Sequence, residues 1–147
     1  MSRNNEVKDF FNKNFSYAIV GASNNENKFG YKIFKALLRA KYNVYPVNPK
    51  EKEVLGQKCY KRLAEIPEDI DVVNFVVPPN VTAKLLEDEV LELGIEKVWF
   101  QPGSFNQNAL IFCKQNNIIY INEFCLLETV EKTNQAPKQK WIRKKDS

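Results

Sequence analysis

A hydrophobic strand that runs into a small-residue turn is the feature that most limits what this chain can fold into. Residues 17–20 are apolar, Gly21-Ala22-Ser23 follows at once, and the β-rich residues 43–47 come one helix length later. Strand, Gly-led turn, helix and strand make the right-handed unit that joins neighbouring parallel strands. The sequence therefore predicts a parallel sheet whose first turn brings backbone N–H groups and the positive end of a helix to one point, where a phosphate is stabilised.

The same alternation continues along the chain. Residues 71–77 are nearly continuous in apolar and β-branched side chains, which is typical of a strand buried on both faces, and Pro78-Pro79 ends it. Asn80 is the expected N-cap of the next helix, and Gly94 its end. The elements expected there are a helix over 80–93, a strand over 97–100, a helix over 106–116 and a strand over 118–121. The predicted fold class is α/β, a single Rossmann-like open, mostly parallel sheet of five to six strands with helices on both faces.

Apolar spacing predicts two further helices. A short leading helix that packs aromatic rings on the sheet is predicted from Val7, Phe10, Phe11 and Phe15. The helix after the first turn should end near Lys41 and bury one stripe, which consists of Phe29, Ile33, Phe34, Leu37 and Leu38. Before the central strand we expect a turn over 55–57, a short strand over 58–60 and a helical turn over 62–66.

Length and composition fit one globular domain. The chain has 147 residues and 44% hydrophobic content, which is close to the commonest domain size and ample for one core. It has no run of about twenty apolar residues and begins unlike a secretory signal, which predicts a cytoplasmic protein without a membrane span. Its three cysteines are odd in number and widely spaced, and it has no histidine, so neither a disulfide framework nor a metal site is predicted.

Basic charge is concentrated at the C-terminus. Residues 136–147 hold five Lys and Arg against one acidic residue, whereas residues 1–135 hold seventeen of each sign, so the net charge of +4 comes from this tail. Its cations could meet an acidic surface, an RNA or a membrane face; they are Lys138, Lys140, Arg143, Lys144 and Lys145, around Trp141. We expect a solvated, frayed terminus instead, because the core strands offer no aromatic platforms for nucleic acid.

The end of the second strand indicates which nucleotide carries the phosphate. NAD sites usually place an Asp or Glu there to bind the ribose 2′-hydroxyl, but this chain has Asn48, Pro49 and Lys50, with no carboxylate before Glu51. A cation at this point favours a phosphorylated ribose. Two ligands remain as candidates. One is coenzyme A, in which Lys50 would neutralise the 3′-phosphate, and the other is NADP, which carries a 2′-phosphate.

Ligands of open parallel sheets bind outside the carboxyl ends of the strands, where the strand order reverses. The loops after the first, second and central strands all lie on that edge. Gly21 gives the tight turn there, and Ser23 offers a hydroxyl and an N–H to phosphate. Lys28 adds charge near the helix start, and Gly30 allows close approach of backbone to ligand or strand. Val77-Pro78-Pro79 makes a rigid apolar wall for an adenine.

Five spaced segments carry a family resemblance. They are Val20-Gly21-Ala22-Ser23 with Lys28 and Gly30, Tyr45-Pro46-Val47-Asn48-Pro49-Lys50, Leu55-Gly56-Gln57, Val76-Val77-Pro78 and Trp99-Phe100-Gln101-Pro102-Gly103-Ser104. They resemble the small stand-alone CoA-binding proteins, whose fold matches the CoA-binding domain of the succinyl-CoA synthetase alpha subunit, over about Phe15 to Val130. The resemblance implies that residues 21–24 line the pyrophosphate loop, that Lys50 faces the CoA phosphates and that residues 76–78 border the adenine. The predicted cofactor-binding residues are Gly21, Ala22, Ser23, Asn24, Lys28, Gly30, Asn48, Lys50, Val76, Val77 and Pro78.

The resemblance also implies a division of the chain and a function. The synthetase works through a phosphohistidine in a further domain and a partner subunit, and this chain has neither histidine nor room for them. It resembles a non-catalytic module that binds coenzyme A or an acyl-CoA, as a sensor or as a subunit that delivers the cofactor. The expected parts are a helical extension (1–15), the CoA-binding domain (16–131) and a basic, flexible tail (132–147). The sequence leaves open whether the chain forms a homo-oligomer or binds a protein partner.

An NADP-dependent oxidoreductase is the alternative function. Such an enzyme needs a proton donor at the nicotinamide, and Tyr31 and Lys35 have the spacing of a Tyr-x-x-x-Lys pair, but they stand on the first helix of the alternating fold. The segment Asn122-Glu123-Phe124-Cys125 resembles the family's segment after the last strand, which often carries a cysteine. We therefore expect Cys125 near the open edge of the site as a packed cysteine; the alternative is a thiol that forms a mixed disulfide with CoA.

Overall fold

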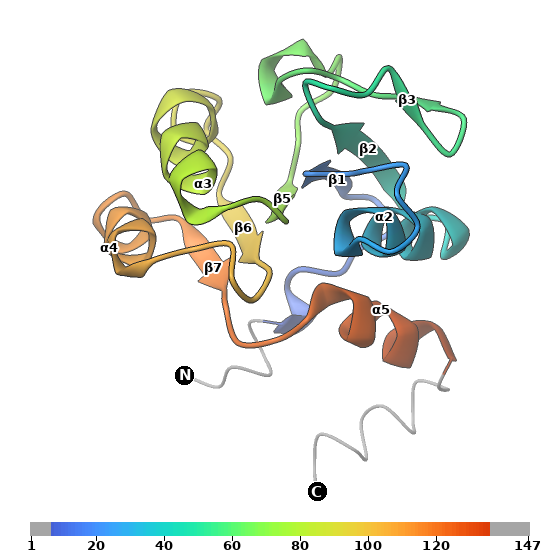
Figure 1. Ribbon diagram of the computed structural model, residues 1–147. Helices are drawn as coiled ribbons and strands as arrows, with labels where there is room; N and C mark the ends of the chain where they lie inside the picture. The colour runs from blue at the N-terminus through green and yellow to red at the C-terminus, as the bar shows by residue number, and fades with distance from the viewer. Residues whose placement is uncertain (1–6, 136–147) are drawn as a thin grey trace, which may run out of the picture.

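Residues 7–135 are described by the structure, a computed structural model (Figure 1). Within them, five parallel strands form one sheet in the order β2-β1-β5-β6-β7. Their bounds are Ser16–Val20 for β1, Asn43–Val47 for β2, Val72–Phe75 for β5, Lys97–Phe100 for β6 and Ile119–Ile121 for β7. The strand order reverses between β1 and β5, because β2 is added on one side of β1 and β5 on the other. The predicted α/β fold class is confirmed.

Helices cover both faces of this sheet (Figure 1). The helices α2 (Phe29–Arg39) and α5 (Leu126–Gln135) pack on one face. The opposite face is covered by α3 (Pro79–Leu85), its π-helical continuation η2 (Leu86–Val90) and α4 (Gln107–Gln115). Val72 belongs to the first of these hydrophobic cores and Val73 to the second, as expected for a central strand buried on both faces.

The apolar stripe of α2 is confirmed except at its first residue. Ile33, Phe34 and Leu37 are completely buried against the sheet, whereas the Phe29 side chain is 51% exposed. In a right-handed crossover the helix begins at the carboxyl edge of the sheet, so its first turn extends past the strands it covers. The prediction that Phe29 joins the core stripe is wrong for this reason.

The junction between β5 and α3 differs in detail from the prediction. The strand ends at Phe75 rather than residue 77, and Pro78 is the N-cap of α3, so the prediction of Asn80 as N-cap is wrong. Pro79 takes the first helical position, where proline lacks only an N–H that would have no partner within the helix. The helix therefore starts closer to the strand and holds residues 76–78 as a tight connection.

A two-stranded hairpin and the helix α5 did not follow from the sequence patterns. The hairpin pairs β3 (Glu53–Val54) with β4 (Gln57–Lys58) through Leu55 and Gly56, which both have positive φ. The turn expected over 55–57 is thus present, but the strand expected over 58–60 begins earlier, and Tyr60 makes only an isolated bridge to Val47. The expected helical turn is η1 (Leu63–Glu65).

The segment before β1 packs on the sheet as its aromatic residues predict. Phe10 is completely buried, and its ring meets the Trp99 ring edge-on at a centroid distance of 5.7 Å. Of the expected leading helix, residues 7–8 are helical, and residues 1–6 lie outside the described residues. Of the basic, flexible tail expected over 132–147, residues 132–135 belong to α5, and residues 136–147 lie outside the described residues. No helix of the described part of the chain is long and apolar enough to cross a membrane.

Candidate functional site

Three loops meet at the carboxyl edge of the sheet, at the point where the strand order reverses (Figure 1). The Gly21 N–H donates to the Val47 carbonyl at 2.9 Å, and the Val76 N–H donates to the Val20 carbonyl at 2.8 Å. These bonds tie the loop after β1 to the ends of both neighbouring strands. The structure thus brings together the three segments in which the binding residues were predicted.

Two glycines bring backbone against backbone at this point. Gly21 has a φ of +103°, and a β-carbon on it would lie 2.6 Å from the Val76 carbonyl oxygen. A β-carbon on Gly30 would lie 2.0 Å from the Gly21 carbonyl oxygen. No side chain fits at either position without moving the backbone, so the first turn of α2 lies directly against the loop after β1.

Ala22 and Ser23 turn inward in this loop. Ala22 is completely buried, and its N–H and carbonyl are bonded to Ile19 and Asn48, so it supports the loop from within. The Ser23 side chain is 8% exposed, and its Oγ accepts a hydrogen bond from the Asn25 N–H at 3.0 Å. The hydroxyl therefore shapes the turn as an acceptor, while its own proton is still available to donate.

The N-terminus of α2 points to the same edge. Lys28 occupies the N-cap position, no side chain of the described residues caps this end, and the first turn holds no acidic residue. The exposed Lys28 side chain adds a full positive charge to the partial charge of an eleven-residue helix. The start of α2 therefore contributes a positive field that favours an anion at the loop after β1.

Asn48 connects the loop after β2 to the loop after β1. Its Nδ2 donates to the Ala22 carbonyl at 2.8 Å, and its Oδ1 accepts from the Lys50 N–H at 2.9 Å. Both polar groups of this amide are thus bonded within the protein. Asn48 fixes the position from which the exposed Lys50 extends, and its predicted contact with the cofactor stays a prediction.

The third loop is apolar. Val76 and Val77 are half-buried and pack on opposite cores, and Pro78 is exposed at the start of α3. Since a β-carbon on Gly21 would also come within 2.9 Å of Val77 Cγ1, these residues border the first loop directly. The predicted role of residues 76–78 as the wall of an adenine site stays a prediction.

Two polar residues at this edge were not predicted. The Glu51 carboxylate accepts a hydrogen bond from Asn24 Nδ2 at 2.9 Å, and Asn24 Nδ2 also donates to the Glu53 carbonyl at 2.8 Å. Gln101, which is buried directly after β6, donates from Nε2 to Cys125 Sγ at 3.0 Å. A polar residue that directly follows a buried strand on the carboxyl edge is the signal that could have identified Gln101.

The thiols differ in their surroundings. Burial raises the pKa of Cys59 to about 11 and that of Cys113 to about 12, so both stay protonated at neutral pH. Cys125 is half-buried and comes just before α5, whose Leu126 N–H donates to Gln101 Oε1 at 3.0 Å. Gln101 therefore connects the end of β6 to the start of α5, and Cys125 lies at this connection.

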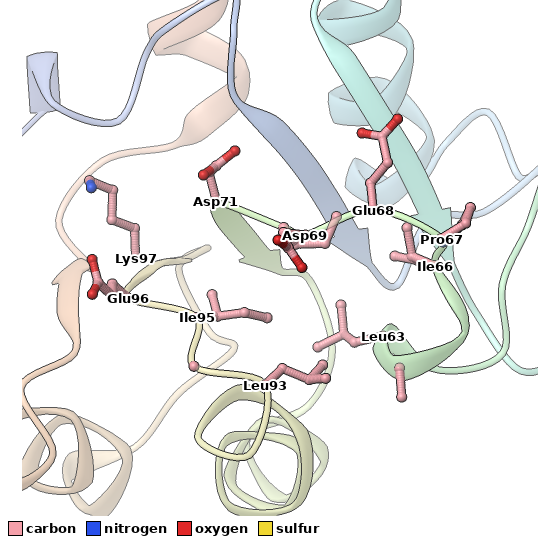
Figure 2. Close-up of a pocket in the computed structure, with 13 residues that line it drawn as sticks. Leu63, Ile66, Pro67, Glu68, Asp69, Asp71, Leu93, Ile95, Glu96 and Lys97 are labelled. Atoms are coloured by element: carbon pink, nitrogen blue, oxygen red, sulfur yellow. The ribbon is translucent and has the colours of Figure 1, made fainter.

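A separate pocket of about 650 Å³ lies at the opposite, amino edge of the sheet (Figure 2). Leu63 from η1 and Ile95 from the loop before β6 lie on facing sides of it. Its Glu68 accepts hydrogen bonds from Ser16 Oγ at 2.8 Å and Asn43 Nδ2 at 2.9 Å, and hydrogen bonds from Tyr45, Ser16 and Asn43 lower the pKa of Glu68. This carboxylate holds the beginnings of β1 and β2 together. The pocket is distinct from the edge where the three loops meet.

Comparison with known proteins agrees with the fold and the position of these loops. The CoA binding domain family matches residues 15–130. The uncharacterized protein YneT of Bacillus subtilis is 31% identical over 121 residues, which make up 82% of this chain and 89% of that protein. The alpha subunit of an ADP-forming acetate–CoA ligase II of Pyrococcus furiosus is 40% identical over 102 residues, 69% of this chain, but the chain spans only 22% of that subunit.

Solved structures extend the comparison to the backbone. A hypothetical protein from Pyrococcus horikoshii OT3 is 32% identical and superimposes with a TM-score of 0.81 over 90% of this chain and 92% of that one. Similarity over nearly the whole of both chains shows a shared arrangement of strands, helices and loops. The resemblance predicted from the sequence is confirmed, and the chain belongs to the CoA binding domain family.

Proposed function

We propose that this chain binds coenzyme A or an acyl-CoA at the carboxyl edge of the sheet, as a non-catalytic module. The observation that carries the proposal is the contact of three loops at the reversal of strand order, where the Gly21 and Gly30 backbones meet and α2 begins. A tight backbone turn beside a helix N-terminus is the arrangement that binds a pyrophosphate in doubly wound folds. Membership of the CoA binding domain family supports coenzyme A as the nucleotide.

The backbone donors divide into two groups in this proposal. The N–H groups of Gly21 and Ala22 already donate to the carbonyls of Val47 and Ile19. The N–H groups of Asn25, Asn27 and Lys28 also donate within the loop. The pyrophosphate would therefore be bound by the donors of Ser23 and of the first turn of α2. Lys28 would supply positive charge to the same phosphates.

The remaining parts of the ligand fit the two neighbouring loops. Lys50, exposed at the end of the loop that Asn48 fixes, would bind the 3′-phosphate of the ribose. The apolar connection of residues 76–78 would cover one face of the adenine. We propose no catalytic residue. Among the described residues, no contact joins a nucleophile to a base at a place where the acyl group of a bound thioester could react.

A titration of the purified, reduced protein with four ligands tests the proposal. Isothermal calorimetry with CoA, dephospho-CoA, NADP and NAD should give the tightest binding for CoA and weaker binding for dephospho-CoA, which lacks the 3′-phosphate. Tighter binding of NADP than of CoA would move the protein to the oxidoreductase class. Binding of none of the four ligands would contradict the proposed function and leave the fold unaffected.

A further inference from the structure

Glu51 places a negative charge inside the loop that the proposed function assigns to phosphate. Its Oε1 accepts from Asn24 Nδ2 at 2.9 Å, and its Oε2 lies 3.5 Å from the backbone N of Asn24. The second distance is long for a hydrogen bond, but it points the same carboxylate at a backbone N–H of the loop. Glu51 thus contacts the side chain and the main chain of one residue.

The position of Glu51 is fixed by the surrounding backbone. Its own N–H donates to the Asn48 carbonyl at 3.3 Å, and Asn24 is held a second time through the Glu53 carbonyl at 2.8 Å. Glu51 is half-buried, whereas its neighbours Lys50 and Lys52 are exposed. The carboxylate is therefore turned toward the loop while the adjacent lysines extend into solvent.

A carboxylate and a phosphate compete for the same donors. Both are anions that accept hydrogen bonds from backbone and amide N–H groups, and two like charges at one site repel each other. A phosphate that reaches the Asn24 N–H would meet the Glu51 carboxylate there. The charge of Glu51 also offsets that of the neighbouring Lys50, which the proposed function assigns to the 3′-phosphate.

We propose that Glu51 is an internal anion that occupies the phosphate loop of the free protein and is displaced from Asn24 when the nucleotide binds. This inference rests on the proposed function and adds to it a residue that regulates the same site. When the nucleotide binds, the contacts between Asn24 and Glu51 are lost. The negative charge of Glu51 also weakens the electrostatic attraction between the site and the phosphates. Glu51 consequently lowers the affinity for CoA below the value that the loop alone would give.

The substitution Glu51→Gln tests this role with little change in structure. Glutamine keeps one oxygen that can accept from Asn24 Nδ2, and it loses both the charge and the second oxygen, which faces the Asn24 backbone N–H. The matched control is Glu53→Gln, which removes the same charge from an exposed side chain two residues away. In calorimetry at low salt, Glu51→Gln should bind CoA about two- to tenfold more tightly than the wild type, and Glu53→Gln should stay within about twofold.

Failure of this inference is distinguishable from failure of the proposed function. CoA binding by all three proteins with no gain in Glu51→Gln over Glu53→Gln would overturn the role of Glu51 and leave CoA binding in place. Absence of CoA binding in all three would overturn the proposed function. In that case inorganic pyrophosphate is the probe: tighter binding to Glu51→Gln than to the control supports the internal anion, and equal or absent binding overturns it.

The free protein gives a second, independent measurement. The side-chain and backbone amide signals of Asn24 in a nitrogen-15 NMR spectrum should shift more in Glu51→Gln than in Glu53→Gln, which keeps the backbone carbonyl that accepts from Asn24 Nδ2. Saturating CoA should move the Asn24 signals of the wild type away from their free positions as the carboxylate leaves. Unchanged Asn24 signals in Glu51→Gln, or in the CoA complex, would contradict the contact or its displacement.

Discussion

The backbone of Gly30 lies so close to Gly21 that a β-carbon on Gly30 would be 2.0 Å from the Gly21 carbonyl oxygen. This contact places the start of α2 against the loop after β1. It connects a local sequence feature, two glycines nine residues apart, to the geometry of the proposed phosphate site.

Gly30→Ala should therefore be costly although Gly30 lies in a helix. The added methyl group collides with backbone that has little freedom to move, so we expect the free energy of unfolding to fall by about 2–3 kcal/mol. Gly94→Ala is the control, because that glycine has a φ of +72° but open space around its β-carbon position, and should lose only about 1–2 kcal/mol. Urea denaturation of both variants measures the difference; equal losses would contradict the close contact.

Asn48→Ala should loosen the loop that carries Lys50. The substitution removes the bonds to the Ala22 carbonyl and the Lys50 N–H, and we expect a loss of about 1–3 kcal/mol in unfolding free energy. Asn48→Asp keeps the acceptor for the Lys50 N–H but loses the donor to the Ala22 carbonyl. Its free energy of unfolding should therefore fall through the loss of that one hydrogen bond. If thermal unfolding shows no destabilisation in either variant, the connecting role assigned to Asn48 is wrong.

Asn74→Leu should stabilise the protein. Asn74 lies in the middle of β5, is 1% exposed, and neither polar atom of its side chain has a hydrogen-bond partner among the described residues. Replacing it with an apolar side chain of similar shape removes the cost of burying unpaired polar groups, a gain of about 1–2 kcal/mol in unfolding free energy. Denaturant titration measures this change, and a loss of stability would mean that the amide has a partner in the folded protein.

The raised thiol pKa values predict a loss of stability at high pH. Burial raises the pKa of Cys113 from an ordinary value of 9.0 to about 12 in the folded protein, so above pH 9 the unfolded chain releases this proton first. Stability should then fall as the pH rises from about 9 toward 12, by up to about 1.4 kcal/mol per pH unit for this one group. Cys113→Ala should make the fall with pH shallower, whatever its effect at pH 7; an identical slope would contradict the buried thiol.

Much of the fold could be predicted because short stretches of the sequence show which helices and strands they form. Residues 17–20 are apolar throughout, residues 43–47 are rich in β-forming residues, and the buried stripe of α2 has the helical period; the structure contains all three elements. The β3–β4 hairpin was missed because each of its strands has only two residues, too few for any period. The helix α5 was not predicted; its start is fixed by the bond from the Leu126 N–H to Gln101, 25 residues away, and Leu126 and Val130 are buried in the core, which no local pattern shows.

The candidate site could be predicted only as far as its loops. Parallel strands bring their carboxyl ends to one edge, so the positions of Gly21, Lys50 and Val77 follow from topology. The hydrogen bonds between side chains and loops do not follow from topology, because they join residues far apart in the sequence. The bond from Asn48 to Ala22 spans 26 residues, and the bond from Asn24 to Glu51 spans 27.

The central claim, that Lys50 in this loop binds the 3′-phosphate of CoA, is tested most directly by one calorimetric cycle. CoA and dephospho-CoA are titrated into the wild type, Lys50→Ala and, as control, Lys52→Ala, another exposed lysine of the same segment. We predict that the wild type and Lys52→Ala prefer CoA by about tenfold and that Lys50→Ala loses this preference while it still binds dephospho-CoA. An equal preference for CoA in all three proteins, or no binding of CoA to the wild type, would contradict the account.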